Sequence, residues 1–246
     1  MMVPRIVTRM ATMPTTISMI EQAGLYRLLA WLSPAYPIGA FSYSHGVEYA
    51  IEAGLIRDRE TLIAWLQHVL AHGAAWVDAV LLREAHAAAK AEDAAALDEL
   101  ADLAIAWRGT SETALESSQQ GGSFLTITRA AWPHQWLEAF AARRQDRGTA
   151  LPIALGLSGA AHGISIAPLI GGYLHAFAAN LISAAVRIVP LGQTDGQKAL
   201  AALAPLVEAL VPRALAQDMQ RLATAAPMVD WCSMRHETQY TRLFRS

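Results

Sequence analysis

The chain has 246 residues, enough for one large domain or two small ones with a sizeable core. Its 19 basic and 21 acidic residues give a formal charge of −2, so the sequence lacks the basic footprint that nucleic-acid-binding proteins usually carry. The single cysteine, Cys232, excludes an internal disulfide framework and a cysteine-based zinc site, and it fits a reducing cytoplasm.

Residues 1–22 are predicted to be a flexible N-terminal extension outside the folded domain. They include Arg5 and Arg9 but no acidic residue before Glu21, a composition faintly typical of a transit peptide. Because no apolar core is followed by a small-residue cleavage site, a secretory signal is not expected.

From Ala23 onward, apolar residues recur at helical spacing, and the first helix should end at Ser33-Pro34. Its apolar positions are Leu25, Leu28, Leu29 and Leu32. A second helix is expected from Tyr43 to Ala53. A third should follow Asp58, whose side chain can cap it.

The middle of the chain continues the helical pattern. Asp93 is predicted to open a helix that runs toward Trp107, and Thr110 or Ser111 is predicted to cap the next one. The pair Gly121-Gly122 should interrupt that helix, because glycine is a poor helix former.

In the last third, the polar stretch LGQTDGQ should precede a helix over Lys198–Leu210, and Pro212 should start the last regular segment. No run alternates apolar and polar residues for long enough to predict a strand. The sequence therefore predicts an all-α fold, a single globular helical bundle of roughly nine or ten helices over residues 23–229, followed by a tail at 230–246.

Residues 148–186 contain no Asp, Glu, Lys or Arg, and the whole chain is 54% apolar with a mean hydropathy of +0.26. About 20 apolar residues suffice to span a bilayer, so a helical membrane protein is one alternative. The stretch also holds prolines, His162, His175 and Asn180, which are costly against lipid. Two helices buried on all sides in a helical bundle explain the same pattern, with Gly159 and Gly163 allowing close backbone approach, and we favour that interpretation.

Motifs of enzymes are weak in this chain. Neither a P-loop nor a dinucleotide-binding GxGxxG occurs. The stretch GLSGA, followed by Asp195 and His236, resembles the nucleophile elbow of a hydrolase, with Ser158 as the nucleophile. That elbow requires a strand before the turn, so a small helical hydrolase is the less favoured alternative, and Ser158 is expected at a helix crossing.

Two pairs of polar residues have the i, i+4 spacing of one helix face. His68 and His72 could bind a metal from one side, but no third ligand is evident nearby, so a polar face or a partner contact is the better interpretation. Glu112 and Glu116 lack the Glu-x-x-His repeats of a di-iron bundle. We interpret them as a solvated or partner-facing edge.

The tail, DWCSMRHETQYTRLFRS (residues 230–246), interleaves arginines with Trp231, Tyr240 and Phe244. Arg, Tyr and Trp carry much of the binding energy at protein interfaces. A frayed terminus usually lacks such large side chains, so the tail is predicted to bind a partner.

Three stretches, taken together and in this order, resemble the urease accessory protein family UreF. They are PAYPIGAFSYSHGVE, RGTSETALESSQQGGSFL, and the region from LISAAVRIVPLGQTDGQ to SMRHETQYTRLFRS. With the helices between them they cover the chain from about Leu25 to Ser246, and PLGQTDGQ with HETQYTRLF is the most specific combination. Ala40 stands where a glycine is common and Gly122 where a basic residue is common.

The resemblance implies a non-enzymatic, all-α chaperone of the cytoplasm that forms a homodimer. Such a protein binds the accessory protein UreD (UreH in some organisms), recruits the GTPase UreG and docks on apo-urease for nickel insertion, with a regulatory effect on the GTPase. Nickel binding belongs to the complex. For this chain itself the expectation is no catalytic residue, metal site or cofactor, and no nucleic acid or membrane as a partner.

The resemblance also implies partner-binding residues in two segments. In the tail, ordered against UreD/UreH in the family, they are Arg235, His236, Tyr240, Arg242, Leu243, Phe244 and Arg245. In the segment 34–50, similar to a surface used in assembly and in contacting the GTPase, they are Pro37, Gly39, Ser42, Tyr43, His45 and Glu48. From its residue types, this second segment should be a rigid turn with Ser42 as helix cap, displaying aromatic and polar groups at the surface.

Overall fold

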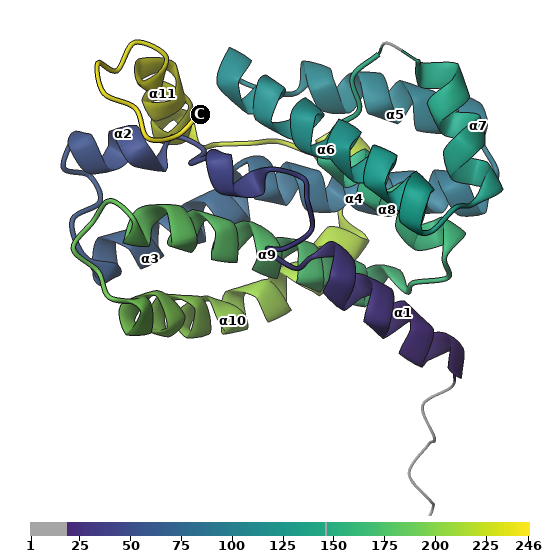
Figure 1. Ribbon diagram of the computed structural model, residues 1–246, viewed down its shortest axis with the longest axis horizontal. Helices are drawn as coiled ribbons and strands as arrows, with labels where there is room; N and C mark the ends of the chain where they lie inside the picture. The colour runs from purple at the N-terminus through teal and green to yellow at the C-terminus, as the bar shows by residue number, and fades with distance from the viewer. Residues whose placement is uncertain (1–18, 146) are drawn as a thin grey trace, which may run out of the picture.

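The structure, a computed structural model, describes residues 19–145 and 147–246, and in these residues it contains helices and no strand (Figure 1). The all-α prediction is confirmed. The α-helices are α1 (Met19–Trp31), α2 (Val47–Glu52), α3 (Arg59–His72), α4 (Ala74–Lys90), α5 (Ala94–Ala106), α6 (Ser111–Ala131), α7 (Gln135–Arg144), α8 (Leu151–Ala161), α9 (Ile166–Val186), α10 (Gln193–Ala216) and α11 (Pro227–His236). Two short 3-10 helices lie at Ala40–Ser42 and Met219–Arg221.

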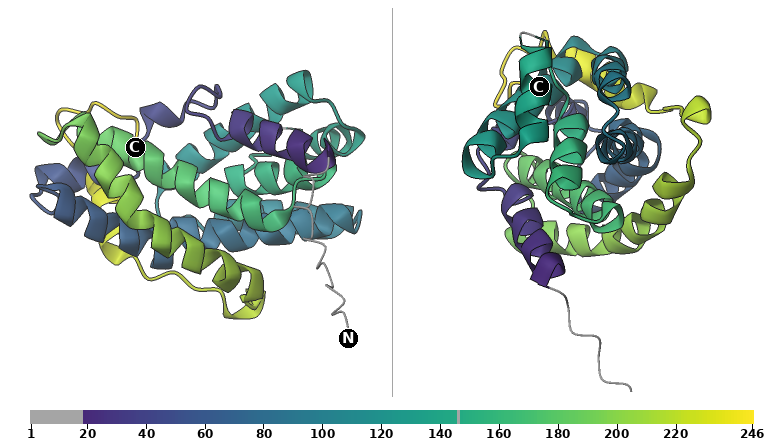
Figure 2. Two further views of the ribbon diagram at one scale, coloured as in Figure 1. Left: turned by 90° about the horizontal axis from the view of Figure 1, so that it is seen from below. Right: turned by 90° about the vertical axis from the view of Figure 1, so that its right-hand side faces the viewer.

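Helices α4 and α8 form the centre of the bundle. Helix α4 packs against α3, α5, α8, α9 and α10, and α6 covers α8 from the other side. Helices α5, α6 and α7 lie at one end of the molecule, and α3, α9 and α10 lie along the rest of α4 (Figure 1). Figure 2 shows α1 on the outside of this bundle. It begins at Met19, inside the segment predicted as an extension, while residues 1–18 lie outside the described part of the chain.

Three predicted helix caps are present. The Asp58 carboxylate accepts the backbone N–H of Thr61, and the Thr61 hydroxyl completes a capping box. Asp93 accepts from Ala96 N, and Thr110 caps α6 by accepting from Thr113 N. These short polar side chains satisfy N–H groups that a helix start leaves without partners.

The predicted break at Gly121-Gly122 is wrong, since α6 runs through both glycines. A Cβ placed on Gly121 would lie 2.0 Å from the carbonyl oxygen of Thr149, whereas a Cβ on Gly122 would meet open space. Gly121 is therefore required by the close crossing of α6 over the chain entering α8, and tertiary packing offsets the helix propensity that glycine lacks.

The predicted boundaries of α10 are also wrong. This helix begins at Gln193, inside the polar stretch, and continues through Pro205 and Pro212 to Ala216. Asp195 lies in its first turn, where a negative charge interacts favourably with the helix dipole. Both prolines are exposed, so the carbonyl groups that lose an N–H donor lie near water and can bond to it.

The uncharged stretch 148–186 forms α8 and α9. Residues 152–160 of α8 are all buried, and α9 packs against α4 and α10. By length and composition α9 and α10 could each cross a membrane, with 50% of the apolar window buried in α9 and 22% in α10. The prediction of a helix buried on all sides is confirmed for α8 but wrong for α9, which is only half-buried.

Within the uncharged stretch, the glycine that allows close approach of two helix backbones is Gly156, which the sequence did not single out. A Cβ there would lie 2.5 Å from the carbonyl oxygen of Leu82 in α4. By contrast, a Cβ on Gly159 would meet the flexible end of Leu169, and Gly163 lies in the turn after α8 with a φ of +68°. The predicted close backbone approach at Gly159 and Gly163 is therefore wrong, since Gly159 faces a side chain and a Cβ on Gly163 would meet open space.

Candidate partner-binding site

The segment 34–50 contains two successive residues in the left-handed region, His45 with a φ of 54° and Gly46 with a φ of 78°. A right-handed helix cannot pass through them, so α2 begins at Val47 and not at Tyr43. Ser42 ends the short 3-10 helix and does not cap α2. The hydroxyl that approaches α2 is that of Ser44, which accepts from Glu48 N at 3.4 Å.

The prediction that this segment displays its polar and aromatic groups is wrong for most of them. Tyr43, His45 and Glu48 are buried. Ser42 and Gly39 are half-buried, and Pro37 is exposed. The large apolar side chain on the outside is Phe41, which is 66% exposed.

The C-terminal tail folds back onto this segment. After α11, the chain runs beside residues 42–44, where Arg245 N donates to Ser42 O at 2.8 Å and Ser44 N donates to Ser246 O at 2.5 Å. The Ser44 hydroxyl also donates to Ser246 O at 2.6 Å. Figure 1 shows this end of the chain next to α2 and α11. Two segments nearly 200 residues apart in sequence, with Ser44 and Ser246 separated by 202 positions, therefore form one site.

Glu48 is the buried acceptor that holds the tail. Its carboxylate accepts the backbone N–H of Leu243 at 2.6 Å and that of Phe244 at 2.9 Å. It also lies 2.9 Å from Nε2 of His236. Hydrogen bonds to an ionised and buried acceptor are strong, and three of them fix the path of the tail over α2.

The other carboxylates of the site come from α6. Glu112 lies 2.9 Å from Nδ1 of His236 and accepts from Arg242 at 3.2 Å. Burial raises the pKa of Glu112, and the hydrogen bonds and charges of His236 and Arg242 limit that rise. One turn later, Glu116 lies 3.0 Å from Nδ1 of His45 and 3.4 Å from the Ser246 hydroxyl.

The interpretation of Glu112 and Glu116 as a solvated or partner-facing edge is wrong, because both side chains are buried inside the chain. The i, i+4 spacing does place them on one face of α6, but that face turns toward α11 and the segment 34–50. This spacing is the sequence signal that places the two carboxylates together. No signal in the sequence identifies the histidine and carboxylate groups that join them in the site, because these groups come from distant parts of the chain.

We refer to Glu48, Glu112, Glu116, His45 and His236 as the buried acid–histidine cluster. Within the described residues, no group of three or more His, Cys, Asp or Glu is arranged to hold a metal ion. In this cluster both ring nitrogens of His236 already face carboxylates. The predicted pair His68 and His72 lies on α3, where His68 Nε2 bonds to Ala225 O at 2.8 Å.

Ser158 does not have the surroundings of a hydrolase nucleophile. It is fully buried within α8, and its hydroxyl has no hydrogen-bond partner among the described residues. The turn that a nucleophile elbow needs is absent there, since α8 continues from Leu151 to Ala161. His236, the base of that alternative, lies against Glu48 and Glu112 instead.

The tail has an inner and an outer face. His236 and Phe244 are buried, and the Phe244 ring packs under the Arg187 guanidinium at 4.3 Å. On the outside, Tyr240 is fully exposed and Leu243 is 64% exposed. The three predicted arginines, Arg235, Arg242 and Arg245, are also exposed.

Helix α11 extends this outer face. Met228, Trp231 and Met234 are large apolar residues spaced at three-residue intervals, and all three are exposed. On its inner side, Thr110 and Ser233 hydroxyls bond at 2.8 Å, and a Cβ on Gly46 would lie 3.1 Å from Ser233 N. Gly46 is thus needed both for its backbone conformation and for the close contact of α2 with α11.

The fold and the site define an all-α protein in which the N-terminal segment 34–50 and the C-terminal tail meet around a buried acid–histidine cluster. The sequence model of the family UreF matches residues 56–204. The urease accessory protein UreF of Granulibacter bethesdensis is 52% identical over 224 residues, which are 91% of this chain and 94% of that protein. The UreF protein of Rhodopseudomonas palustris (strain BisB18) is 49% identical over 94% of this chain and 95% of its own length. The chain belongs to the UreF family of urease accessory proteins.

Proposed function

We propose that the chain is a non-enzymatic chaperone of urease maturation that works by protein contacts in the cytoplasm. In this proposal it forms a homodimer, binds UreD/UreH through its C-terminal tail, and recruits the GTPase UreG to apo-urease for nickel insertion. It also modulates the GTPase. Membership of the urease accessory family and the resemblance of the three sequence stretches support the proposal.

One observation carries the proposed role of the tail: large side chains point to solvent from a segment that the fold holds in place. Tyr240 and Leu243 are exposed, and they lie between His236 and Phe244, which are both buried. Side chains as exposed as Tyr240 and Leu243 add little to the folding stability of the chain that carries them. A pre-ordered segment of this kind suits binding, because a partner then orders fewer side chains on contact.

The outer face of α11 supports the same role, since it adds Met228, Trp231 and Met234 to the surface. The Arg235 guanidinium lies 5.8 Å from the centre of the Tyr49 ring, which connects the tail to α2. An exposed apolar face with aromatic and arginine side chains is typical of a protein interface.

In the segment 34–50, the exposed residues and the buried residues have different proposed roles. Pro37 and Phe41 are exposed and suit a contact with the GTPase or another partner. Tyr43, His45 and Glu48 are buried, so they contribute to binding by positioning the tail and the turn. Gly39 and Ser42 shape that turn, with Gly39 at a φ of 75°.

The test is complex formation with UreD/UreH, measured by size-exclusion chromatography with light scattering. The variant Tyr240→Ala with Leu243→Ala removes only exposed groups, and we expect it to weaken the complex at least about tenfold, as loss of interface anchors does. The matched control is Tyr26→Ala with Leu29→Ala, another exposed tyrosine and leucine three residues apart, on α1. We expect the control to keep its affinity for UreD/UreH.

Wild-type affinity in the Tyr240→Ala/Leu243→Ala variant, with normal helix content by circular dichroism, would show that the tail is not the anchor. Deleting the whole tail is a poorer test, because it also removes Cys232, His236 and Phe244 from the core. If the full chain fails to bind and instead stays with membranes, the apolar helices α9 and α10 are acting as membrane spans.

A further inference from the structure

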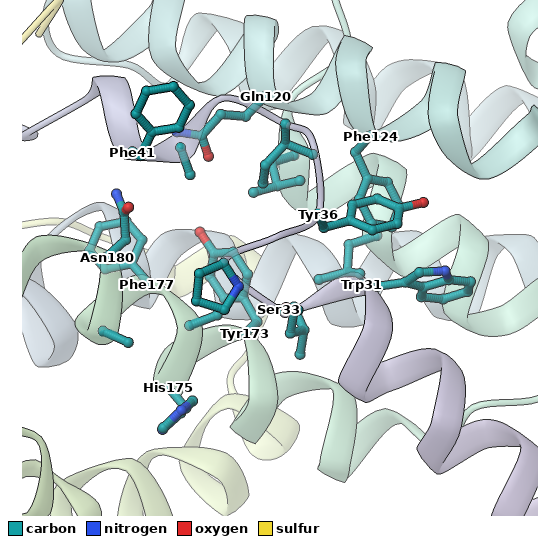
Figure 3. Close-up of a pocket in the computed structure, with 18 of the residues that line it drawn as sticks. Trp31, Ser33, Tyr36, Phe41, Gln120, Phe124, Tyr173, His175, Phe177 and Asn180 are labelled. Carbon is teal, nitrogen blue, oxygen red and sulfur yellow. The ribbon is translucent and has the colours of Figure 1, made fainter. Parts of the chain in front are cut away.

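A cavity of about 200 Å³ opens between the chain after α1, helix α6 and helix α9 (Figure 3). Aromatic rings form much of its wall: Trp31, Tyr36, Phe41, Phe124, Tyr173 and Phe177. Phe41, of the proposed partner contact, and Glu116, of the buried acid–histidine cluster, line it, but no role proposed above fills the space itself. A well-formed apolar pocket with a few polar groups is the usual form of a small-molecule site.

The carboxylate and amide groups of the cavity belong to Glu116, Gln120 and Asn180, and the lining also includes the hydroxyl-bearing residues Ser33, Ser183, Tyr36 and Tyr173. The Glu116 Oε2 atom serves His45 and Ser246, whereas Oε1 accepts only from Gln120, at 3.2 Å, among the described residues. The side chain of Asn180 and the Gln120 oxygen make no hydrogen bond within the described part of the chain. In the view of Figure 3, Gln120 and Asn180 lie with Phe41 toward one end, and Trp31, Tyr36 and Phe124 toward the other. The two amide side chains therefore lie toward the end marked by Phe41, and aromatic rings line both ends of the cavity.

The charge of the lining favours a cation. It contains the carboxylate of Glu116 and, among the described residues that line it, neither lysine nor arginine. His175 is exposed, and in Figure 3 its ring points away from the cavity. A cation is attracted by a carboxylate, by amide oxygens and by aromatic ring faces, whereas the described side chains that line the cavity include no lysine or arginine to pair with an anion.

The volume sets the size of the ligand. An engineered protein cavity of about 150 Å³ holds benzene, so about 200 Å³ suits one ring with a short chain. We propose that this cavity is a binding site for a small organic cation, a primary ammonium group joined to an aromatic or branched apolar body of roughly ten non-hydrogen atoms. The ammonium donates to Glu116, Gln120 and Asn180, and the apolar body packs against Trp31 and Phe124.

The test compares three probes of one shape by isothermal titration and saturation-transfer NMR on the full chain: phenethylammonium, 2-phenylethanol and phenylacetate. We expect the ammonium to bind at least about tenfold more tightly than the alcohol, and the carboxylate not to bind, because only the first matches the charge of the lining. Equal binding of all three, or tighter binding of phenylacetate, would overturn the proposal.

Two variants place the probe in this cavity. Ala179→Phe fills the lining, and we expect it to lose phenethylammonium binding, whereas Ala142→Phe, at an exposed position of α7, should not. Binding that survives in a folded Ala179→Phe variant would refute the site. If that variant does not fold, Asn180→Leu is the deciding test of the site, because it removes the side-chain amide and keeps a side chain of similar volume. We expect it to weaken the ammonium about tenfold, the cost of one hydrogen bond to a charged group, and an unchanged affinity would overturn the proposal.

Discussion

At the scale of single residues, Glu48 is the side chain on which the position of the tail depends most. It is buried and accepts hydrogen bonds from Leu243 N and Phe244 N while facing Nε2 of His236. A glutamine in its place has one oxygen for these three partners and turns an NH₂ group toward donors. We expect Glu48→Gln to lower the free energy of unfolding by about 2–4 kcal/mol, as loss of a buried charged acceptor does.

Urea unfolding and hydrogen exchange at the Leu243 and Phe244 amides measure this effect. The matched control is Glu52→Gln, one turn farther along and exposed, whose carboxylate accepts from the Gln239 amide. The control should change the unfolding free energy by less than about 0.5 kcal/mol. Equal effects of the two variants would show that the cluster does not hold the tail.

Cys232 gives a second prediction at this scale. Burial raises the pKa of its thiol to about 11, and the side chain is fully buried in α11. At pH 8 the folded protein should therefore resist a thiol reagent such as DTNB, with labelling that follows the rate of unfolding in urea. The folded pKa is raised, so ionisation favours unfolding as the pH rises from the ordinary thiol pKa toward about 11. Fast labelling of the native protein would contradict the buried position of Cys232.

The sequence identifies residues of the buried acid–histidine cluster as candidates, but it does not show which of them contact one another. The spacing of Glu112 and Glu116 predicts one helix face correctly, whereas the partner binding predicted from the large side chains of the tail stays a prediction. Nothing local in the sequence indicates that His45 and Glu48 point inward, because that follows from the left-handed turn at His45 and Gly46 and from the return of the tail. Tyr43, His45 and Glu48 were predicted to lie at the surface, but they are buried and support the surface from inside.

At the scale of elements, the two glycines of α6 allow the effect of helix propensity on stability to be compared with the effect of packing. Gly121 crosses the chain before α8 so closely that a Cβ would lie 2.0 Å from Thr149 O, and Gly122 has open space. We expect Gly121→Ala to destabilise the protein by about 3 kcal/mol through overpacking. Gly122→Ala should stabilise it by about 0.5–1 kcal/mol, because alanine is the better helix former.

Thermal unfolding of the two variants measures the difference. Since about 1 kcal/mol shifts the Tm of a chain of this size by roughly 2–4 °C, the two changes should move the Tm in opposite directions. A Gly121→Ala variant as stable as Gly122→Ala would mean that α6 and α8 do not approach as described.

Helix existence was predictable from periodicity, and helix ends were predictable where a cap is local, as at Asp58, Asp93 and Thr110. Predictions of helix breaks and ends from glycine and proline were wrong where tertiary packing determines the course of the helix. The break expected at Gly121-Gly122 is absent because packing requires the glycine, and Pro212 fails to end α10 because the helix is exposed on that side. Local signals cannot report which neighbour approaches a helix or which side faces water.

At the scale of the whole molecule, the structure explains the high apolar content in two ways. The uncharged stretch supplies core helices, with α8 buried and α9 half-buried, and α11 with the tail adds an exposed apolar face. A protein that exposes Trp231, Tyr240 and Leu243 should be poorly soluble alone and better behaved with a partner covering them. Light scattering of the free chain and of the complex, at equal concentration, checks this expectation. A free chain that scatters no more than its complex would count against a covered face.

The most direct test of the central claim, that the chain acts by contacts through its tail, is the activation of apo-urease. Apo-urease would be incubated with nickel, GTP, UreD/UreH and UreG, together with the wild-type chain, the Tyr240→Ala/Leu243→Ala variant, or no added chain. We expect urease activity to appear with the wild-type chain and to fall to the level without the chain in the variant, whose buried groups are intact. Wild-type activation by the variant, or full activation without the chain, would contradict the account.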